Sequence, residues 1–152
     1  MTKDIIHKVI LLADDDLDDA EMFADVLAEI DSTVELYHVP DGFAVFEWLK
    51  NPANPVPDII FLDINMPQIT GWQCLSSLKA DELTKDIPVL IYSTSSHHKD
   101  KQTAIDLGAT AFITKPSDYK ILEDFLTAIV NELHNKDIAS IIRRLSNSLH
   151  LE

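Results

Sequence analysis

Short apolar runs alternate along the chain with longer segments in which apolar residues recur every three or four positions. Each short run is rich in β-branched residues, as expected of a strand that is buried on both faces of a parallel sheet. The apolar runs predict strands at 8–13, 33–39, 58–63, 88–94 and 111–115. The intervening and following segments predict helices at about 18–30, 42–50, 71–81, 98–107 and 117–134. Strict alternation implies parallel strands, right-handed crossovers and helices on both faces of one sheet, which is an α/β fold.

The glycine and proline positions agree with these boundaries. Gly42 and Gly71 stand next to predicted helix starts, and Gly108 falls at a predicted helix C-terminus, where a left-handed residue is favoured. The pair Pro116-Ser117 is expected to open the last helix of the alternation and to cap it.

A further amphipathic helix is predicted over 136–150. Its apolar stripe has helical spacing and consists of Ile138, Ile141, Ile142, Leu145 and Leu149. Two burial sites are open to this stripe: its own domain, or a second subunit beside the helix at 117–134. We prefer the second subunit, and hence a homodimer, because twofold dimers are the commonest assemblies of small proteins.

Composition excludes several classes of protein. The chain has 12 Lys and Arg against 26 Asp and Glu, a net charge of −14. Binding to nucleic acid or to an anionic membrane is therefore not expected, because phosphate contact requires clustered cations. Cys74 is the only cysteine, so no disulfide can form within the chain. The N-terminal residues do not resemble a signal peptide, and no apolar run reaches membrane-spanning length. We expect a soluble, cytoplasmic protein.

Four of the predicted strands end on chemically active side chains. Asp14 and Asp15 follow the first strand, Asp63 ends the third, Ser93 ends the fourth and Lys115 ends the fifth. Ligand sites of open α/β sheets lie outside the carboxyl ends of the strands. The sequence therefore predicts that carboxylates, a hydroxyl and an ammonium group meet at one edge of the sheet.

The predicted carboxylate cluster requires a positive charge. At about 4 Å and an effective dielectric constant of about 20, each pair of carboxylates repels by about 4 kcal/mol. Such a cluster takes up protons or binds a cation. No cysteine or suitably spaced histidine is available, and hard oxygen ligands favour Mg²⁺, with Mn²⁺ as an alternative.

Residues 7–134 resemble the receiver domain of two-component response regulators. The resemblance rests on Asp14-Asp15, the segment FLDINMP at 61–67 with Gly71 four residues beyond its proline, Ser93, and Lys115-Pro116, all in family-like order and spacing. It implies a flavodoxin-like (βα)5 doubly wound parallel sheet with strand order 2-1-3-4-5, and leaves 135–152 as a C-terminal amphipathic helical extension. The long proline-rich loop before Asp63 is similar to that of single-domain regulators paired with bacterial phytochromes.

The resemblance also implies a role for each acidic position. Asp63 would be the nucleophile that takes a phosphoryl group from a phosphohistidine. Asp15 and Asp63 would ligate Mg²⁺ together with the backbone carbonyl of Asn65, and Asp14 would act through a water molecule. The phosphoryl donor would be a histidine kinase or a phosphotransfer protein. The chain would catalyse only its own phosphorylation and dephosphorylation, and would signal through contacts with a downstream protein.

Four further residues are implied in recognising the phosphoryl group and in the response to it. Lys115 would contact the phosphoryl group, Ser93 would hydrogen-bond to it, and Phe112 would change rotamer on activation. Thr94 is bulkier than the alanine that the family often has there. Phe112 lacks the hydroxyl of the more common tyrosine, so one hydrogen bond of the active state would be missing.

Three alternatives share part of this pattern. A haloacid-dehalogenase-type phosphatase also uses a strand-end aspartate, but it needs a second acid where this chain has Asn65. A calcium loop could begin at Asp14, but Asp19 occupies the position that requires glycine. A receiver-like scaffold that is never phosphorylated would not require Asp14, Asp15, Asp63 and Lys115 to be intact.

Overall fold

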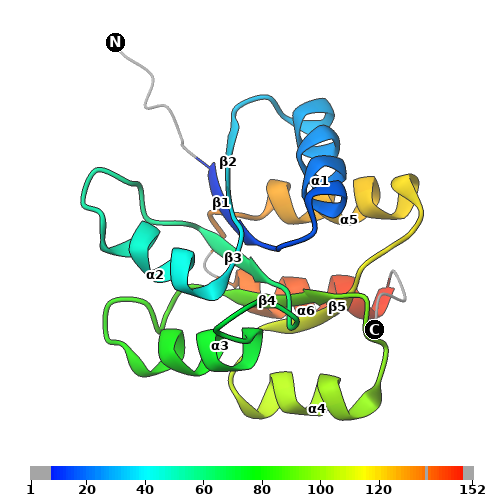
Figure 1. Cartoon of the computed structure of the whole chain (residues 1–152). Helices are drawn as coiled ribbons and strands as arrows, with labels where there is room; N and C mark the ends of the chain where they lie inside the picture. Colours follow the sequence, from blue (N-terminus) through cyan, green and yellow to red (C-terminus); the bar gives the residue numbers. More distant parts are fainter. Residues whose placement is uncertain (1–7, 136, 149–152) are drawn as a thin grey trace.

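The computed structural model describes residues 8–135 and 137–148. A single sheet of five parallel strands forms its centre, and helices connect consecutive strands (Figure 1). The elements, in chain order, are β1 (Lys8–Ala13), α1 (Leu17–Ile30), β2 (Val34–Val39), α2 (Gly42–Lys50), β3 (Ile59–Leu62), α3 (Gly71–Ala80), β4 (Val89–Ser93), α4 (His98–Asp106), β5 (Ala111–Thr114), α5 (Tyr119–Asn131) and α6 (Ile138–Ser148). The strand order β2-β1-β3-β4-β5 confirms the predicted flavodoxin-like topology.

Helices cover both faces of the sheet, because the strand residues alternate between two apolar clusters. Ile10 and Leu12 of β1 pack in the cluster with α1 and α5, whereas Leu11 and Ala13 pack in the cluster with α2, α3 and α4. Strands β1, β3 and β4 are buried almost throughout. This two-sided burial explains why their sequences are continuous apolar runs.

The predicted element boundaries hold to within one or two residues, except for α5. This helix begins at Tyr119 rather than at 117, and it ends at Asn131 rather than at 134. Its N-cap is Asp118, whose carboxylate accepts a hydrogen bond from the backbone N–H of Lys120 at 2.8 Å. The prediction that Pro116-Ser117 opens the helix was therefore wrong, because the next residue, Asp118, supplies the cap.

Helix α6 folds back on its own domain. Ile138 and Ile142 belong to the same apolar cluster as α1, α5 and the strands, and Ile142 is fully buried. The expectation that these two residues need a second subunit for burial was therefore wrong. Leu149 of the predicted stripe lies outside the described residues.

Cys74 lies in the interior of α3, with its thiol 4.0 Å from the backbone carbonyl oxygen of Gly42. Burial raises the pKa of this thiol to about 12. Cys74 is therefore an unreactive packing residue.

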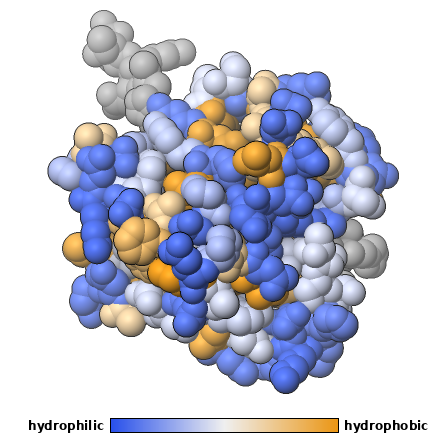
Figure 2. Space-filling model, in the orientation of Figure 1, coloured by the Kyte–Doolittle hydropathy of each residue, from blue (hydrophilic) through white to orange (hydrophobic). Residues whose placement is uncertain are grey.

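Hydrophilic side chains dominate the visible surface, with small apolar patches between them (Figure 2). This distribution agrees with a net charge of −14 on the full sequence. Within the described part of the chain, no helix has both the length and the apolar character that a membrane span requires.

Candidate functional site

Backbone hydrogen bonds between neighbouring strands place the predicted site residues at one edge of the sheet. The N–H of Asp14 donates to the carbonyl of Val39 at 3.1 Å, and the N–H of Asp63 donates to the carbonyl of Ala13 at 3.0 Å. The N–H of Lys115 donates to the carbonyl of Ser93 at 2.7 Å. These bonds tie the end of β1 to those of β2 and β3, and the end of β5 to that of β4, while the pairing of β3 with β4 joins the two groups. The site residues therefore meet at the carboxyl edge of the sheet.

Three carboxylates meet at this edge. Asp14, Asp15 and Asp63 each offer an oxygen atom, and these atoms lie within 4.8 Å of one another. Asp14 is fully buried and Asp63 is 8% exposed, whereas Asp15 is exposed to solvent. The cluster therefore has two shielded members and one member that faces water.

Asp14 has one satisfied and one unsatisfied oxygen. Its Oδ1 accepts a hydrogen bond from the backbone N–H of Asp16 at 2.9 Å. Its Oδ2 is buried and accepts no well-directed hydrogen bond within the described part of the chain, although the Lys115 ammonium lies 2.7 Å away. Burial raises the pKa of Asp14 above its usual value, against the opposing effect of Lys115. A buried oxygen of this kind is a natural acceptor for a water molecule or a metal-bound water.

Lys115 is the cation of the site. Its side chain is 7% exposed, and its Nζ lies 2.7 Å from Asp14, 2.8 Å from Asp19 and 3.3 Å from Asp63. Nζ also lies 5.6 Å from the centre of the Tyr92 ring, within the range of a cation–π contact. Burial favours the neutral amine, but the bonds to Asp14 and Asp19 and the attraction of Asp63 outweigh it, so the pKa of Lys115 is raised.

Asp19 is a site residue that the sequence reasoning did not assign. It lies in the first turn of α1, the helix that follows β1. The N-cap of this helix is Asp16, whose side chain accepts from the backbone N–H of Asp19 at 3.1 Å. The cap fixes the orientation of the first turn and brings the Asp19 carboxylate to Lys115. Five aspartates occur between 14 and 19, and only the direction of the helix distinguishes Asp19 from its neighbours.

The loop from Asp63 to α3 passes very close to the site. A Cβ atom at Gly71 would lie 2.2 Å from the carbonyl oxygen of Asp63, so only glycine can occupy this position. The N–H of Gly71 donates to the carbonyl of Ile64 at 2.9 Å, which closes the loop. Asn65 lies on this loop with an exposed side chain. Gln68, at φ 67°, has the positive backbone angle of a tight turn.

The predicted switch residues occupy different surroundings. Ser93 is fully buried, and its Oγ accepts a hydrogen bond from the N–H of Ser95 at 3.3 Å. Thr94 is exposed beside it. Phe112 is 3% exposed and lines a separate pocket of about 580 Å³.

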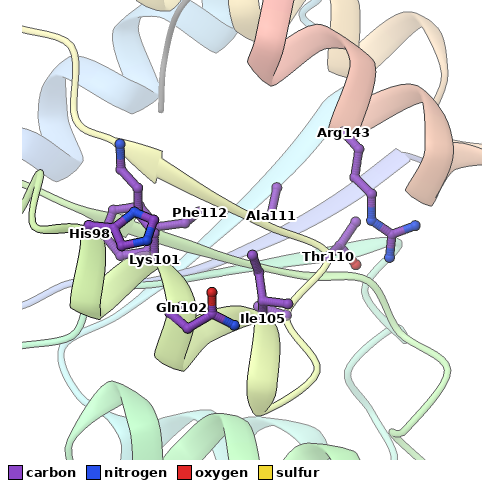
Figure 3. A pocket seen from close by; sticks show the side chains of 9 residues that line it. His98, Lys101, Gln102, Ile105, Thr110, Ala111, Phe112 and Arg143 are labelled. Carbon is purple, nitrogen blue, oxygen red and sulfur yellow. The ribbon is translucent and has the colours of Figure 1, made fainter.

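That pocket lies between α4, β5 and α6 and is called the α4–α6 pocket below (Figure 3). Its floor comes from β5 and the loop before it, and α4 forms one wall. Arg143 of α6 stands on the opposite side from the α4 residues. The full lining consists of His98, Lys101, Gln102, Ile105, Ala109, Thr110, Ala111, Phe112 and Arg143.

The donor set at the carboxyl edge fits a divalent cation. Asp14, Asp15, Asp19 and Asp63 carry four negative charges when ionised, and Lys115 supplies one positive charge. All the available ligand atoms are hard oxygens, which Mg²⁺ and Mn²⁺ prefer. The unsatisfied Asp14 oxygen also has the burial and charge expected of a group that faces a hydrated ion.

Comparisons with known proteins support the same conclusion as the geometry. Residues 10–127 match the family model of the response regulator receiver domain. Response regulator Rcp1 of Synechocystis is 31% identical over 119 residues, which cover 76% of this chain and 81% of Rcp1.

Solved structures of phytochrome-related regulators share the fold. The phosphorylated cyanobacterial phytochrome response regulator RcpA is 29% identical, with a TM-score of 0.77 over 86% of this chain and 96% of that one. The Mn²⁺-bound form of Rcp1 is 28% identical, with a TM-score of 0.72 over 81% of this chain and 94% of that one. These matches favour a receiver domain over the haloacid-dehalogenase-type phosphatase. The chain belongs to the receiver domain family of two-component response regulators.

Proposed function

We propose that this receiver accepts a phosphoryl group on the Asp63 carboxylate from the phosphohistidine of a histidine kinase or a phosphotransfer protein. The supporting observation is the position of Asp63, whose carboxylate lies 3.3 Å from the Lys115 ammonium and forms one cluster with the carboxylates of Asp14 and Asp15. The Asp63 side chain is largely shielded from solvent and also contacts the Lys115 ammonium. Receivers as a family take phosphoryl groups from such donors, and RcpA is known in a phosphorylated form.

The transfer forms one bond and breaks one bond. An oxygen of Asp63 attacks the phosphorus atom, the P–N bond of the phosphohistidine breaks, and its electron pair stays on the imidazole nitrogen. The product is an acyl phosphate. Lys115 neutralises part of the charge on the transferred oxygens, and its raised pKa keeps it protonated throughout the physiological range.

Asp15, Asp63 and the backbone carbonyl of Asn65 would hold Mg²⁺, and Asp14 would contact it through water. When bound, the ion supplies charge neutralisation for the phosphoryl oxygens. Mn²⁺ has the same ligand preference, and the related Rcp1 binds it. The chain would catalyse its own phosphorylation and dephosphorylation and would turn over no separate substrate.

The response would pass from the phosphoryl group through Ser93 to Phe112. The hydroxyl of Ser93 would leave its hydrogen bond with Ser95 and bind the phosphoryl group. Its movement, next to the exposed Thr94, would change the space available to Phe112. Because Phe112 lines the α4–α6 pocket, a new rotamer would alter the surface presented to a downstream protein.

Three wider predictions accompany this function. Residues 7–134 would act as the receiver, with 135–152 as an extension that modifies it. The protein would work in the cytoplasm, without contact with nucleic acid. A homodimer stays a prediction, and it would use surfaces other than the buried Ile138 and Ile142.

The test is phosphorylation by acetyl phosphate with Mg²⁺, followed by intact-mass analysis. We expect one phosphoryl group on the wild type and none on Asp63→Asn, with unchanged circular dichroism. Excess chelator should abolish labelling of the wild type. A wild type that stays unlabelled both by acetyl phosphate and by phosphorylated kinases would favour the scaffold alternative, and equal labelling of Asp63→Asn would place the acceptor elsewhere.

A further inference from the structure

Lys115 divides its contacts unevenly among its three carboxylate partners. An ammonium group has three N–H donors. Nζ of Lys115 lies 2.7 Å from Asp14 and donates a hydrogen bond of 2.8 Å to Asp19, whereas its hydrogen bond to Asp63 is longer, at 3.3 Å. The cation is therefore bound more closely by the two flanking acids than by the carboxylate that we propose as phosphoryl acceptor.

The two flanking acids differ in how easily they can release Lys115. The Asp14 side chain is fully buried, so separation from Lys115 would leave a carboxylate without solvent. The Asp19 side chain is 36% exposed, and water can replace the ammonium group around it. Asp19 is also outside the cluster of oxygens that could hold a metal ion. Release of Asp19 is thus the less costly way to free an N–H donor of Lys115.

We propose that Asp19 is a positioning residue that sets how readily the site accepts a phosphoryl group. It holds Lys115 in a resting position, and Lys115 must leave this contact with Asp19 to bind the phosphoryl group. This inference rests on the proposed function of Asp63. A phosphoryl group brings a charge of about −1.5 to −2 to the site. Its oxygens compete with Asp19 for the ammonium group, so the Asp19–Lys115 ion pair opposes phosphorylation and favours the unmodified state.

The chain provides a matched control for this proposal. Asp18 lies beside Asp19 in the first turn of α1, and it is exposed. Asp18→Asn and Asp19→Asn remove the same charge from the same helix end, and both leave the Asp16 cap in place. Only Asp19→Asn removes a contact with Lys115. Asp19→Glu keeps the charge and can still reach the ammonium group.

The first measurement is the affinity of each variant for beryllofluoride, a non-covalent phosphoryl mimic, by titration calorimetry in saturating Mg²⁺. We expect Asp19→Asn to bind the mimic about two- to fivefold more tightly than Asp18→Asn, the size of a partly exposed ion pair. Asp19→Glu should return the affinity toward the wild-type value. The Mg²⁺ concentration that half-saturates the protein without the mimic should be the same in Asp18→Asn and Asp19→Asn.

The second measurement is the rate of phosphorylation by acetyl phosphate, which should rise in the same order as the affinity. Equal behaviour of Asp18→Asn and Asp19→Asn, or weaker binding by Asp19→Asn, would overturn the role of Asp19. A shifted Mg²⁺ requirement in Asp19→Asn alone would also overturn it, because Asp19 would then act on the metal. If the wild type accepts neither beryllofluoride nor a phosphoryl group, the proposed function itself fails.

Discussion

The acidic edge of the sheet and the α4–α6 pocket differ in almost every physical property. At the acidic edge, the buried carboxylates that follow β1 and β3 lie within a few ångströms of Lys115, which follows β5. The pocket has a volume of about 580 Å³, and the cations Lys101 and Arg143 are among its lining residues. The first region has the charge density needed to bind a small, highly charged group. The α4–α6 pocket is wider and is bounded by a helix, so it is better suited to contact with the surface of another protein.

The two regions also depend on different parts of the fold. The acidic edge depends on tight backbone contacts around the strand ends. The pocket depends on α6, which lies against β5 and α5 through apolar packing. Substitutions that loosen the packing of α6 should therefore leave the chemistry at Asp63 largely unaffected.

Gly71→Ala should produce the largest effect. The added Cβ would lie 2.2 Å from the Asp63 carbonyl oxygen, and its three nearest atoms all belong to the backbone of Asp63 and Ile64, so no side chain can move to relieve the clash. We expect a loss of about 3 kcal/mol in the free energy of unfolding, measured by urea denaturation, together with slower phosphorylation. Gly42→Ala is the control, because its Cβ would meet Ile69 at 3.2 Å with flexible side-chain atoms nearest. Equal losses in both variants would show that the approach of the loop to Asp63 is not tight.

Ile142→Ala should destabilise the protein without affecting the acidic edge. Ile142 is fully buried, and its truncation should cost about 2 kcal/mol. Ile141→Ala removes the same atoms from a less buried neighbour and should cost less. Phosphorylation of Asp63 by acetyl phosphate should proceed at the wild-type rate in both. A markedly slower rate in Ile142→Ala would mean that α6 and the site are coupled.

Asp14→Asn should have the smallest effect and the opposite sign, raising the free energy of unfolding in chelator by about 1 kcal/mol. Burial raises the pKa of Asp14, so ionisation of this group costs stability in the folded state. The contribution of the protonated Asp14 carboxyl to folding stability is complete below the pKa of this group in the unfolded chain, about 3.9. The contribution is lost as the pH rises through the pKa of Asp14 in the folded protein.

The stability difference between Asp14→Asn and the wild type should therefore grow from pH 4 to pH 7. Asp18→Asn removes an exposed carboxylate and should show almost no such growth. A constant difference between pH 4 and pH 7 for Asp14→Asn would contradict the cost assigned to its burial.

The acidic edge was predictable from sequence because its residues follow buried strands directly. Asp63 and Lys115 end apolar runs, and parallel strands bring their carboxyl ends together whatever the helices do. Asp19 was not predictable in the same way. Its contact with Lys115 depends on the direction in which α1 leaves the strand and on the Asp16 cap, which the spacing of aspartates does not reveal.

The placement of α6 shows a second limit of the sequence. The apolar stripe predicted the helix correctly, and α6 begins at Ile138. Periodicity indicates that one side of a helix is buried, but it does not identify the surface that buries it. The structure decides between the two surfaces, because Ile138 and Ile142 are buried in the apolar cluster of α1, α5 and the strands rather than against a second subunit.

The burial of Cys74 makes the protein convenient for site-specific spectroscopy. A thiol with no exposed surface and a pKa of about 12 has almost no thiolate at neutral pH, so maleimide reagents should not label the native protein. A probe can therefore be attached to a new cysteine without first replacing the native one. Cysteines introduced for Lys101 and Arg143, on opposite sides of the α4–α6 pocket, would give a pair of labels whose separation reports pocket width before and after phosphorylation.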